Sequence, residues 1–235
     1  MYIIFDTETT GLPRSYDAPM SADDNWPRLV QLAWQLHDAK GKLISNNNFI
    51  VKPEGFTIPY NAEKVHGIST DRAMKEGHDL VKVLEILHQD VVKAKYLVGH
   101  NIGFDINVVG SEFLRKDVPM QLQQMKELDT KDISTEFCAL PGGRGGKFKW
   151  PTLTELHKKL FGVGFEDAHD AAYDVAATAK CFFGLITQKV QPPVSGVEVS
   201  EVIYEEPKLE AANFVEAKDD QKAAAKDVLR AAGKA

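Results

Sequence analysis

Cysteine is scarce in this sequence, and long apolar runs are missing. Its 235 residues include two cysteines, Cys138 and Cys181, which form neither a CxxC motif nor the spacing of a disulfide framework. This usage favours the reducing cytoplasm, and we expect both thiols to be buried. No apolar run approaches the length of a membrane span, and no basic leader precedes the first apolar stretch. The sequence therefore predicts neither a membrane segment nor a signal peptide.

An excess of positive charge is missing as well. The formal net charge is −6, which argues against a protein that coats nucleic acid through bulk electrostatics. It does not exclude an enzyme that acts at a strand terminus, because bound cations would neutralise acidic groups at the site. The chain is long enough for one large domain or for one domain with an appendage, and we expect the second.

The periodicity of apolar residues predicts an α/β protein. The first three predicted strands include a hairpin with a turn at 40–42, so we expect the N-terminal third to form a three-stranded antiparallel unit. The strands are predicted at 2–8, 28–38, 43–51, 96–98 and close to 128. Helices are predicted over 61–66, 70–74, 78–91, 101 to about 114, 133–137, 152–161 and 170–187.

Two acidic residues lie on the first predicted strand. Side chains two apart on a strand share a face, so Asp6 and Glu8 are expected to point the same way. Two carboxylates on one face repel each other unless a cation lies between them. For an isolated Asp-x-Glu pair, a polar strand end that happens to be acidic is the better explanation.

Three further ionisable residues complete a candidate site. Asp105 falls about one turn inside the helix that follows Asn101, although a carboxylate that interacts with the helix dipole would explain it without a site. His169 lies five residues before Asp174, at the start of an alanine-rich helix that can pack closely against a sheet. With the two acids of the first strand, these give four carboxylates and one imidazole. That set is typical of a two-metal site that cleaves phosphodiesters.

Residues 140–151 are rich in glycine, basic residues and aromatic residues. Glycines allow a backbone to approach a phosphate closely, and Arg, Lys and aromatic side chains supply charge and stacking for single strands. A flexible solvated loop explains the same composition, and the sequence leaves both interpretations open.

The character of the sequence changes at about residue 191. Pro192-Pro193 ends the last predicted helix, and an acidic stretch with little strand pattern follows. Residues 211–232 are rich in Ala, Lys and Asp and could form a marginal helix. We expect 191–235 to be an acidic linker and C-terminal tail, which is either disordered or a docking helix.

Three motifs together resemble those of the DEDDh exonuclease family, which includes the DnaQ-like proofreading ε subunit of bacterial DNA polymerase III. They are Phe-Asp-Thr-Glu-Thr-Thr-Gly-Leu at 5–12, His-Asn-Ile-Gly-Phe-Asp at 100–105 and His-Asp-Ala-Ala-Tyr-Asp at 169–174. The resemblance covers about residues 1–188. It implies a ribonuclease H-like fold, in which helices flank a mixed five-stranded sheet, with the exonuclease domain at 1–190.

The resemblance also implies 3′→5′ exonuclease activity that releases nucleoside 5′-monophosphates. By motif, the metal ligands of the family correspond to Asp6, Glu8, Asp105 and Asp174, and its general base corresponds to His169. The positions that line the terminal-nucleotide pocket in relatives correspond to Thr9, Leu12, His66, Asn101 and Phe104, with Leu12 against the last base.

The expected cofactors are two divalent cations, Mg²⁺ or Mn²⁺, because a site of hard oxygen ligands disfavours zinc. The expected substrate is the 3′ end of DNA, preferably single-stranded, in proofreading or repair. An RNA-trimming exonuclease of the ribonuclease T or oligoribonuclease type would use the same site. A catalytically silent nucleic-acid-binding or polymerase-associated module is the alternative of another class, although clustered buried carboxylates would serve no purpose there. A DNA polymerase or another replication or repair protein could bind through the tail.

Overall fold

The centre of the protein is a mixed five-stranded sheet in the order β3-β2-β1-β4-β5. The computed structural model describes residues 1–165 and 170–206. β1 pairs antiparallel with β2, and β2 pairs antiparallel with β3, while β4 and β5 run parallel to β1. The predicted antiparallel unit and the mixed sheet are confirmed. The strands are β1 (Tyr2–Thr9), β2 (Leu29–His37), β3 (Leu43–Ile50), β4 (Tyr96–Gly99) and β5 (Lys126–Asp129).

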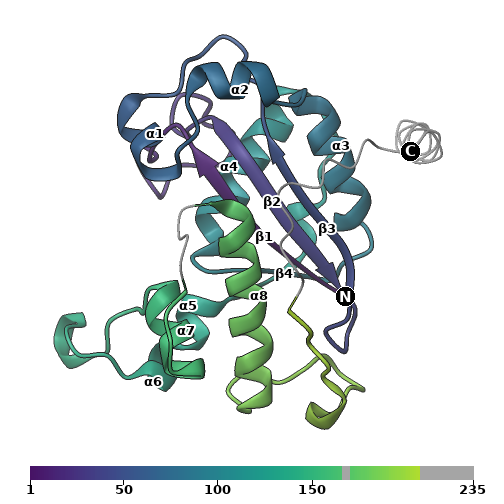
Figure 1. Ribbon diagram of the computed structural model, residues 1–235, viewed down its shortest axis with the longest axis vertical. Coiled ribbons are helices and arrows are strands. Elements are labelled where there is room, and N and C mark those ends of the chain that lie inside the picture. The colour runs from purple at the N-terminus through teal and green to yellow at the C-terminus, as the bar shows by residue number, and fades with distance from the viewer. Residues whose placement is uncertain (166–169, 207–235) are drawn as a thin grey trace.

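Helices cover both faces of this sheet, with α8 in front of it and α4 behind it in Figure 1. The α-helices are α1 (Tyr60–His66), α2 (Thr70–Glu76), α3 (Leu80–Val91), α4 (Ile102–Arg115), α5 (Thr130–Ile133), α6 (Thr135–Cys138), α7 (Leu153–Phe161) and α8 (Ala171–Thr187). The short 3-10 helices are η1 (Leu122–Gln124), η2 (Arg144–Gly146) and η3 (Val199–Glu201). In the described part of the chain, no helix combines the length and the apolar character needed to cross a membrane.

Alternate residues of β1 belong to different cores, because successive side chains of a strand point to opposite faces. Ile3 and Phe5 are buried in the core that the sheet forms with α3 and α4. Tyr2 and Ile4 are buried in the core that it forms with α8. The even-numbered positions of β1 therefore face α8, and the odd-numbered positions face α4.

Small side chains bring α8 close to the sheet. Ala171, Val175 and Ala179 lie one turn apart along α8 and are buried against it. Further along the helix, Phe182 contacts the ring of Tyr2 edge-on, with 4.9 Å between the ring centroids. Burial of one such large side chain contributes about 1.5–3 kcal/mol to stability. The first turn of α8 is thereby held beside the carboxyl end of β1.

Residues 191–206 extend the packed surface of the domain. The backbone N–H of Ile203 donates to the carbonyl oxygen of Lys40 at 2.8 Å. The ring of Tyr204 stacks on Phe183 of α8, with 5.0 Å between centroids and 17° between planes. The predicted helix over 211–232 lies outside the described residues.

Local details differ from the prediction in one region. The helix expected over 133–137 is replaced by α5 and α6, which meet at Ser134. The hydroxyl of Ser134 donates to the carbonyl oxygen of Thr130 at 2.6 Å and shares this acceptor with the backbone N–H of Ser134 at 3.1 Å. Cys138 and Cys181 are both free and buried, as expected.

Candidate active site

Two candidate ligands lie at the carboxyl end of β1. Asp6 and Glu8 are half-buried and share the face that α8 covers, as their two-residue spacing predicts. Because β1 is the middle strand of the sheet, both acids lie in the interior of the fold and not at a sheet edge.

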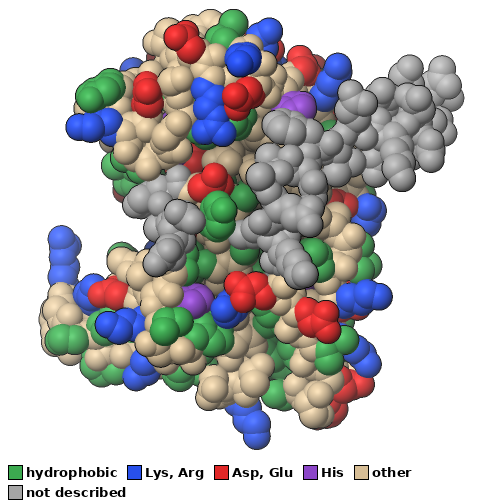
Figure 2. Space-filling model, in the orientation of Figure 1, with side chains coloured by type: hydrophobic (Ala, Val, Ile, Leu, Met, Phe, Trp, Pro, Cys, Tyr) green, Lys and Arg blue, Asp and Glu red, His purple; other side chains and the backbone are tan. Residues whose placement is uncertain are grey.

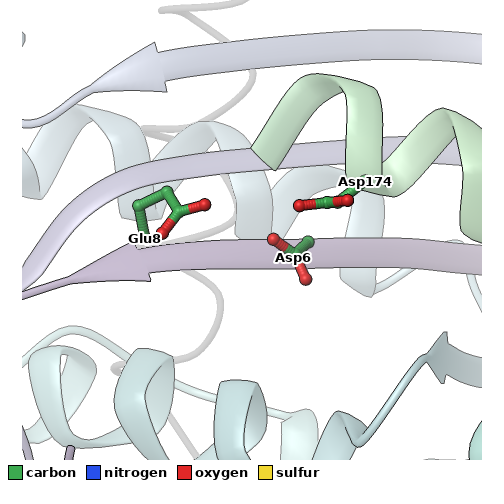
Figure 3. Close-up of side chains that lie close together, drawn as sticks. All are labelled: Asp6, Glu8 and Asp174. Atoms are coloured by element: carbon green, nitrogen blue, oxygen red, sulfur yellow. The ribbon is translucent and has the colours of Figure 1, made fainter. Parts of the chain in front are cut away.

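Asp174 joins them from the first turn of α8. One carboxylate oxygen each from Asp6, Glu8 and Asp174 lie within 4.8 Å of one another. Figure 3 shows the three side chains gathered between β1 and the start of α8. Two oxygens bound to one Mg²⁺ ion are at most about 4.2 Å apart, because each Mg–O distance is about 2.1 Å. Small side-chain rotations would bring the three oxygens to that spacing, so the donor set fits a hard divalent cation.

A glutamine on β2 fixes the start of α8. Asp170 is the N-cap of this helix, and its Oδ1 accepts from the backbone N–H of Ala172 at 2.9 Å and from Nε2 of Gln31 at 3.2 Å. Oε1 of Gln31 accepts from the backbone N–H of Ala171 at 3.3 Å. Its Nε2 also lies 3.0 Å from Oδ1 of Asn48 on β3. One buried amide therefore positions the turn that carries the third ligand.

Asp105 approaches from the other face of β1. It lies in the first turn of α4 and is only 4% exposed. Its Oδ1 accepts a hydrogen bond from the hydroxyl of Thr7 at 2.6 Å. β4 pairs with β1 as far as Ile4 and ends at Gly99, where the chain turns into α4. Asp105 consequently meets β1 just beyond the end of that pairing.

Thr7 and Gln31 were not predicted as parts of the site. Gln31 had only a weak signal, since it is one of two glutamines in a largely apolar strand, and both are buried in the structure. Thr7 had none, because a threonine is ordinary in a strand.

The negative charge of each acidic residue makes ionisation of its neighbours less favourable. Burial, together with the charges of the neighbouring acids, raises the pKa of Asp6 well above its ordinary value. Burial and then the charges of Asp174, Asp105 and Asp170 raise the pKa of Glu8 to about 8. Burial raises the pKa of Asp105 to about 7, although the hydrogen bonds from Thr7 act in the opposite direction. Such a cluster is stabilised in its charged form by cations.

Two of the predicted pocket residues lie together beyond the acids. Thr9 and His66 are each 8% exposed, and the imidazole of His66 lies beside the Thr9 backbone. Nδ1 of His66 accepts from the backbone N–H of Ile68 at 3.1 Å. Burial lowers the pKa of His66, so its neutral form is favoured. The hydroxyl of Thr9 donates to the carbonyl oxygen of Gly11 at 2.7 Å.

The other predicted pocket residues lie near the start of α4 and after β1. Asn101 is exposed and left-handed, with φ of 73°, and Phe104 is half-buried with its ring 6.5 Å from that of Tyr16. Leu12 is 74% exposed, so its side chain is accessible to a ligand. His169, the predicted base, lies outside the described residues.

Known DNA polymerases contain a similar sequence. The chain is 29% identical over 187 residues to the PolC-type DNA polymerase III of Streptococcus pneumoniae serotype 2, and this match covers 80% of the chain and 11% of that polymerase. It is 28% identical over 183 residues to the corresponding polymerase of Streptococcus thermophilus strain LMD-9, and this match covers 77% of the chain and 11% of that polymerase. The chain thus spans about a ninth of the length of these relatives.

Solved structures share the fold. E. coli exonuclease I in complex with a dA16 oligonucleotide matches with a TM-score of 0.62 at 21% identity, over 81% of this chain and 41% of that chain. The zinc-bound form of the same enzyme with single-stranded DNA matches with a TM-score of 0.61 at 23% identity, over 80% of this chain and 40% of that chain. These likenesses confirm the expected ribonuclease H-like fold.

The model of the RNase T exonuclease family matches residues 3–182, which include β1 and most of α8. The match spans all three motifs. This chain therefore belongs to the RNase T family of DnaQ-like exonucleases.

Proposed function

We propose that this protein is a metal-dependent 3′→5′ exonuclease that removes nucleoside 5′-monophosphates from the 3′ end of DNA, preferably single-stranded. The observation that carries the proposal is the convergence of Asp6, Glu8 and Asp174 within 4.8 Å, with Asp105 bound to the intervening Thr7. Oxygen donors of this kind suit Mg²⁺ or Mn²⁺.

Each acid has a separate part in the proposal. Asp6, Glu8 and Asp174 would hold one cation, and Asp105, whose charge acts on Asp6, would be a ligand of the second. When bound, such cations activate water and stabilise the charge that develops on a phosphate under attack. His169 is directly joined to Asp170, the N-cap that Gln31 holds, and is proposed to accept the proton of the attacking water.

Single-stranded DNA as the substrate is supported by the relatives. The matched exonuclease I structures contain DNA oligonucleotides, and the matched sequences belong to DNA polymerases. The RNA-trimming alternative would use the same carboxylates, so it must be separated by experiment. The silent-module alternative is disfavoured, because mutually repelling carboxylates would cost stability without supporting a function.

A DNA polymerase is the proposed partner, bound through the segment after residue 190. The polymerase relatives support this choice, since their matching segment is part of a polymerase chain. Gel filtration of the protein with the replicative polymerase of the same organism should show co-elution, and deletion of residues 207–235 should abolish it. Co-elution of the truncated protein would show that residues 207–235 are not the binding segment.

The activity can be tested by gel-resolved digestion of 5′-labelled single-stranded DNA and of RNA of the same sequence, with Mg²⁺, Mn²⁺ or EDTA. We expect a metal-dependent ladder that shortens from the 3′ end, faster for DNA. Asp174→Ala should abolish the ladder. Asp71→Ala should not, because Asp71 also lies in the first turn of a helix but is exposed on α2.

The absence of shortening with either polymer and either metal would refute the proposed exonuclease. Faster shortening of RNA would assign the chain to RNA processing instead.

A further inference from the structure

We propose that Trp150, backed by Lys131, is a stacking platform for a nucleobase of the single strand bound at the carboxylate site. The inference rests on the proposed function and adds a recognition site to it. The ligand class is an unpaired nucleobase in a polynucleotide, of either DNA or RNA, because every base offers a π face.

Trp150 is unusual among the tryptophans of this chain. The sequence contains three, and the structure describes all of them. Trp26 and Trp34 are 3% and 0% exposed, whereas Trp150 is 65% exposed. An indole this exposed offers a large apolar surface that a ligand could cover.

A cation lies against this indole. Nζ of Lys131 is 4.4 Å from the ring centroid of Trp150, within the range of a cation–π interaction. The ammonium group orients the indole, which reduces the conformational entropy that a ligand would have to remove. The same ammonium group lies 3.9 Å from Asp129 and 3.8 Å from Asp132, so these acids also hold it in place.

The platform is connected to the start of α4. Nζ of Lys131 donates to the side-chain oxygen of Asn101 at 2.8 Å, and Asn101 directly precedes the helix that carries Asp105. The next residue along from Trp150, Pro151, has its carbonyl oxygen 2.9 Å from Nε2 of His100. Two consecutive residues before α4, His100 and Asn101, are therefore bonded to Pro151 and Lys131, which links the loop of Trp150 to the start of the helix that carries Asp105.

The loop that carries Trp150 has a defined shape. The backbone N–H of Lys149 donates to the carbonyl oxygen of Leu140 at 2.9 Å, which closes the loop at its base. Nζ of Lys149 binds Glu155 at 2.7 Å. A Cβ at Gly143 would lie 2.3 Å from the carbonyl oxygen of Lys147, so this position requires glycine. These contacts favour the binding interpretation of residues 140–151 over that of an unstructured solvated loop.

Two basic residues near Trp150 have no ion pair among the described residues, whereas Lys131 and Lys149 are paired with acids. Arg144 and Lys147 are exposed on the same loop, and Phe148 is 40% exposed. Figure 2 shows Lys and Arg side chains over the lower left part of the molecule, where Figure 1 places α5, α6 and α7. A positive surface with exposed aromatic rings is typical of sites for single strands.

Binding can be followed by quenching of the emission of Trp150, because the other two tryptophans are buried and a base cannot stack on them. The probes are thymidine oligonucleotides whose linkages are phosphorothioates that resist cleavage, added to the full chain with Mg²⁺. We expect the oligonucleotide to quench the emission of the wild type. Trp150→Phe should bind with similar affinity but without this quenching, because a phenyl ring still stacks.

Affinity measured by fluorescence anisotropy gives the second readout. Trp150→Ala should bind about 5- to 150-fold more weakly, the range found when one stacking aromatic side chain is removed. The matched control is Tyr60→Ala, since Tyr60 is 69% exposed on α1 and Lys64 lies 5.3 Å from the centroid of its ring. The control should bind as the wild type does, and thermal unfolding will show whether each variant is folded.

A series of oligonucleotides with one abasic position, moved stepwise from the 3′ end, separates stacking from a general structural effect. In the wild type, one position of the abasic site should weaken binding about as much as Trp150→Ala does. In Trp150→Ala, the same oligonucleotide should bind no more weakly than the intact one.

The inference would be overturned if folded Trp150→Ala bound with the affinity of the wild type, or if the abasic site had the same effect in both proteins. The proposed function would still stand in that case, provided that the wild type shortened oligonucleotides in a metal-dependent way. Failure of the wild type to shorten any oligonucleotide would refute the proposed function itself.

Discussion

Replacement of Glu8 by glutamine should stabilise the metal-free protein, and increasingly so as the pH rises. The folded-state pKa of Glu8 is about 8, above the ordinary value of 4.5 that applies in the unfolded chain. A group with a raised folded-state pKa contributes stability that is present below the unfolded pKa and is lost as the pH rises through the folded pKa. The wild type in EDTA should therefore lose stability between pH 4 and pH 8. Glu8→Gln should lose less.

The size of this effect follows from the same shift. Each pKa unit corresponds to about 1.4 kcal/mol, so the full shift would give an upper bound of about 5 kcal/mol. Glu8 is partly solvated and shares its repulsion with three other acids, which reduces the expected stabilisation at pH 8 to about 2 kcal/mol. For a chain of this size that is an increase in Tm of about 4–8 °C.

Urea unfolding at pH 5 and pH 8, in EDTA and in saturating Mg²⁺, provides the assay. A cation that binds only the folded state stabilises it, and the gain should be larger for the wild type than for Glu8→Gln, which lacks one charged ligand. Glu127→Gln, a change at an exposed position of β5, is the control and should alter stability little under all four conditions. An effect of Glu8→Gln that is equal at pH 5 and pH 8, or an undiminished gain from Mg²⁺, would refute the reasoning.

Three other substitutions test single contacts of the site. Thr7→Val removes the hydroxyl that binds Asp105 and should weaken Mn²⁺ binding about 10-fold by calorimetry, whereas Thr7→Ser should restore it; equal affinities would contradict the assigned role. Gln31→Leu should lower the free energy of unfolding in urea by about 1–3 kcal/mol, because it leaves the start of α8 without its partner, and an unchanged value would show that the helix does not need the amide. His169→Ala should retain metal and oligonucleotide binding but reduce the single-turnover rate about 10²–10⁴-fold, and a rate equal to that of the wild type across pH 6–9 would exclude His169 as the base.

Much of the fold could be predicted from the sequence because the signals were local. The two-residue period of β1 placed Asp6 and Glu8 on one face, and the alanines of α8 indicated close packing against the sheet. The hairpin of β2 and β3 followed from a turn between two apolar runs. In each case the periodicity of a short segment specifies which side chains are buried.

The remainder of the site depends on contacts between residues far apart in the sequence. Thr7 and Asp105 are 98 positions apart, and Gln31 and Asp170 are 139 apart. No periodicity relates such residues, so their pairing is determined only when the sheet forms. The contact between Lys131 and Trp150 was missed for the same reason, although the composition of the loop had indicated a possible role.

The packing of residues 191–206 against the domain could not be predicted from the sequence either. Their composition is acidic, and a single aromatic residue, Tyr204, makes the stacking contact with Phe183. One side chain in a polar stretch produces no periodic pattern.

The pairing of β1 with β2 along its whole length has a kinetic consequence. Asp6 and Glu8 belong to a strand whose amide hydrogens should exchange with solvent only when the whole domain unfolds. Asp174 instead lies in the first turn of α8, where helices fray, and that turn is held by the side chains of Asp170 and Gln31. Two ligands are therefore permanent features of the sheet, and the third is present only while the helix start is closed. The residence time of a bound cation should thus follow the opening rate of this one helical turn, which hydrogen exchange of its amides would measure.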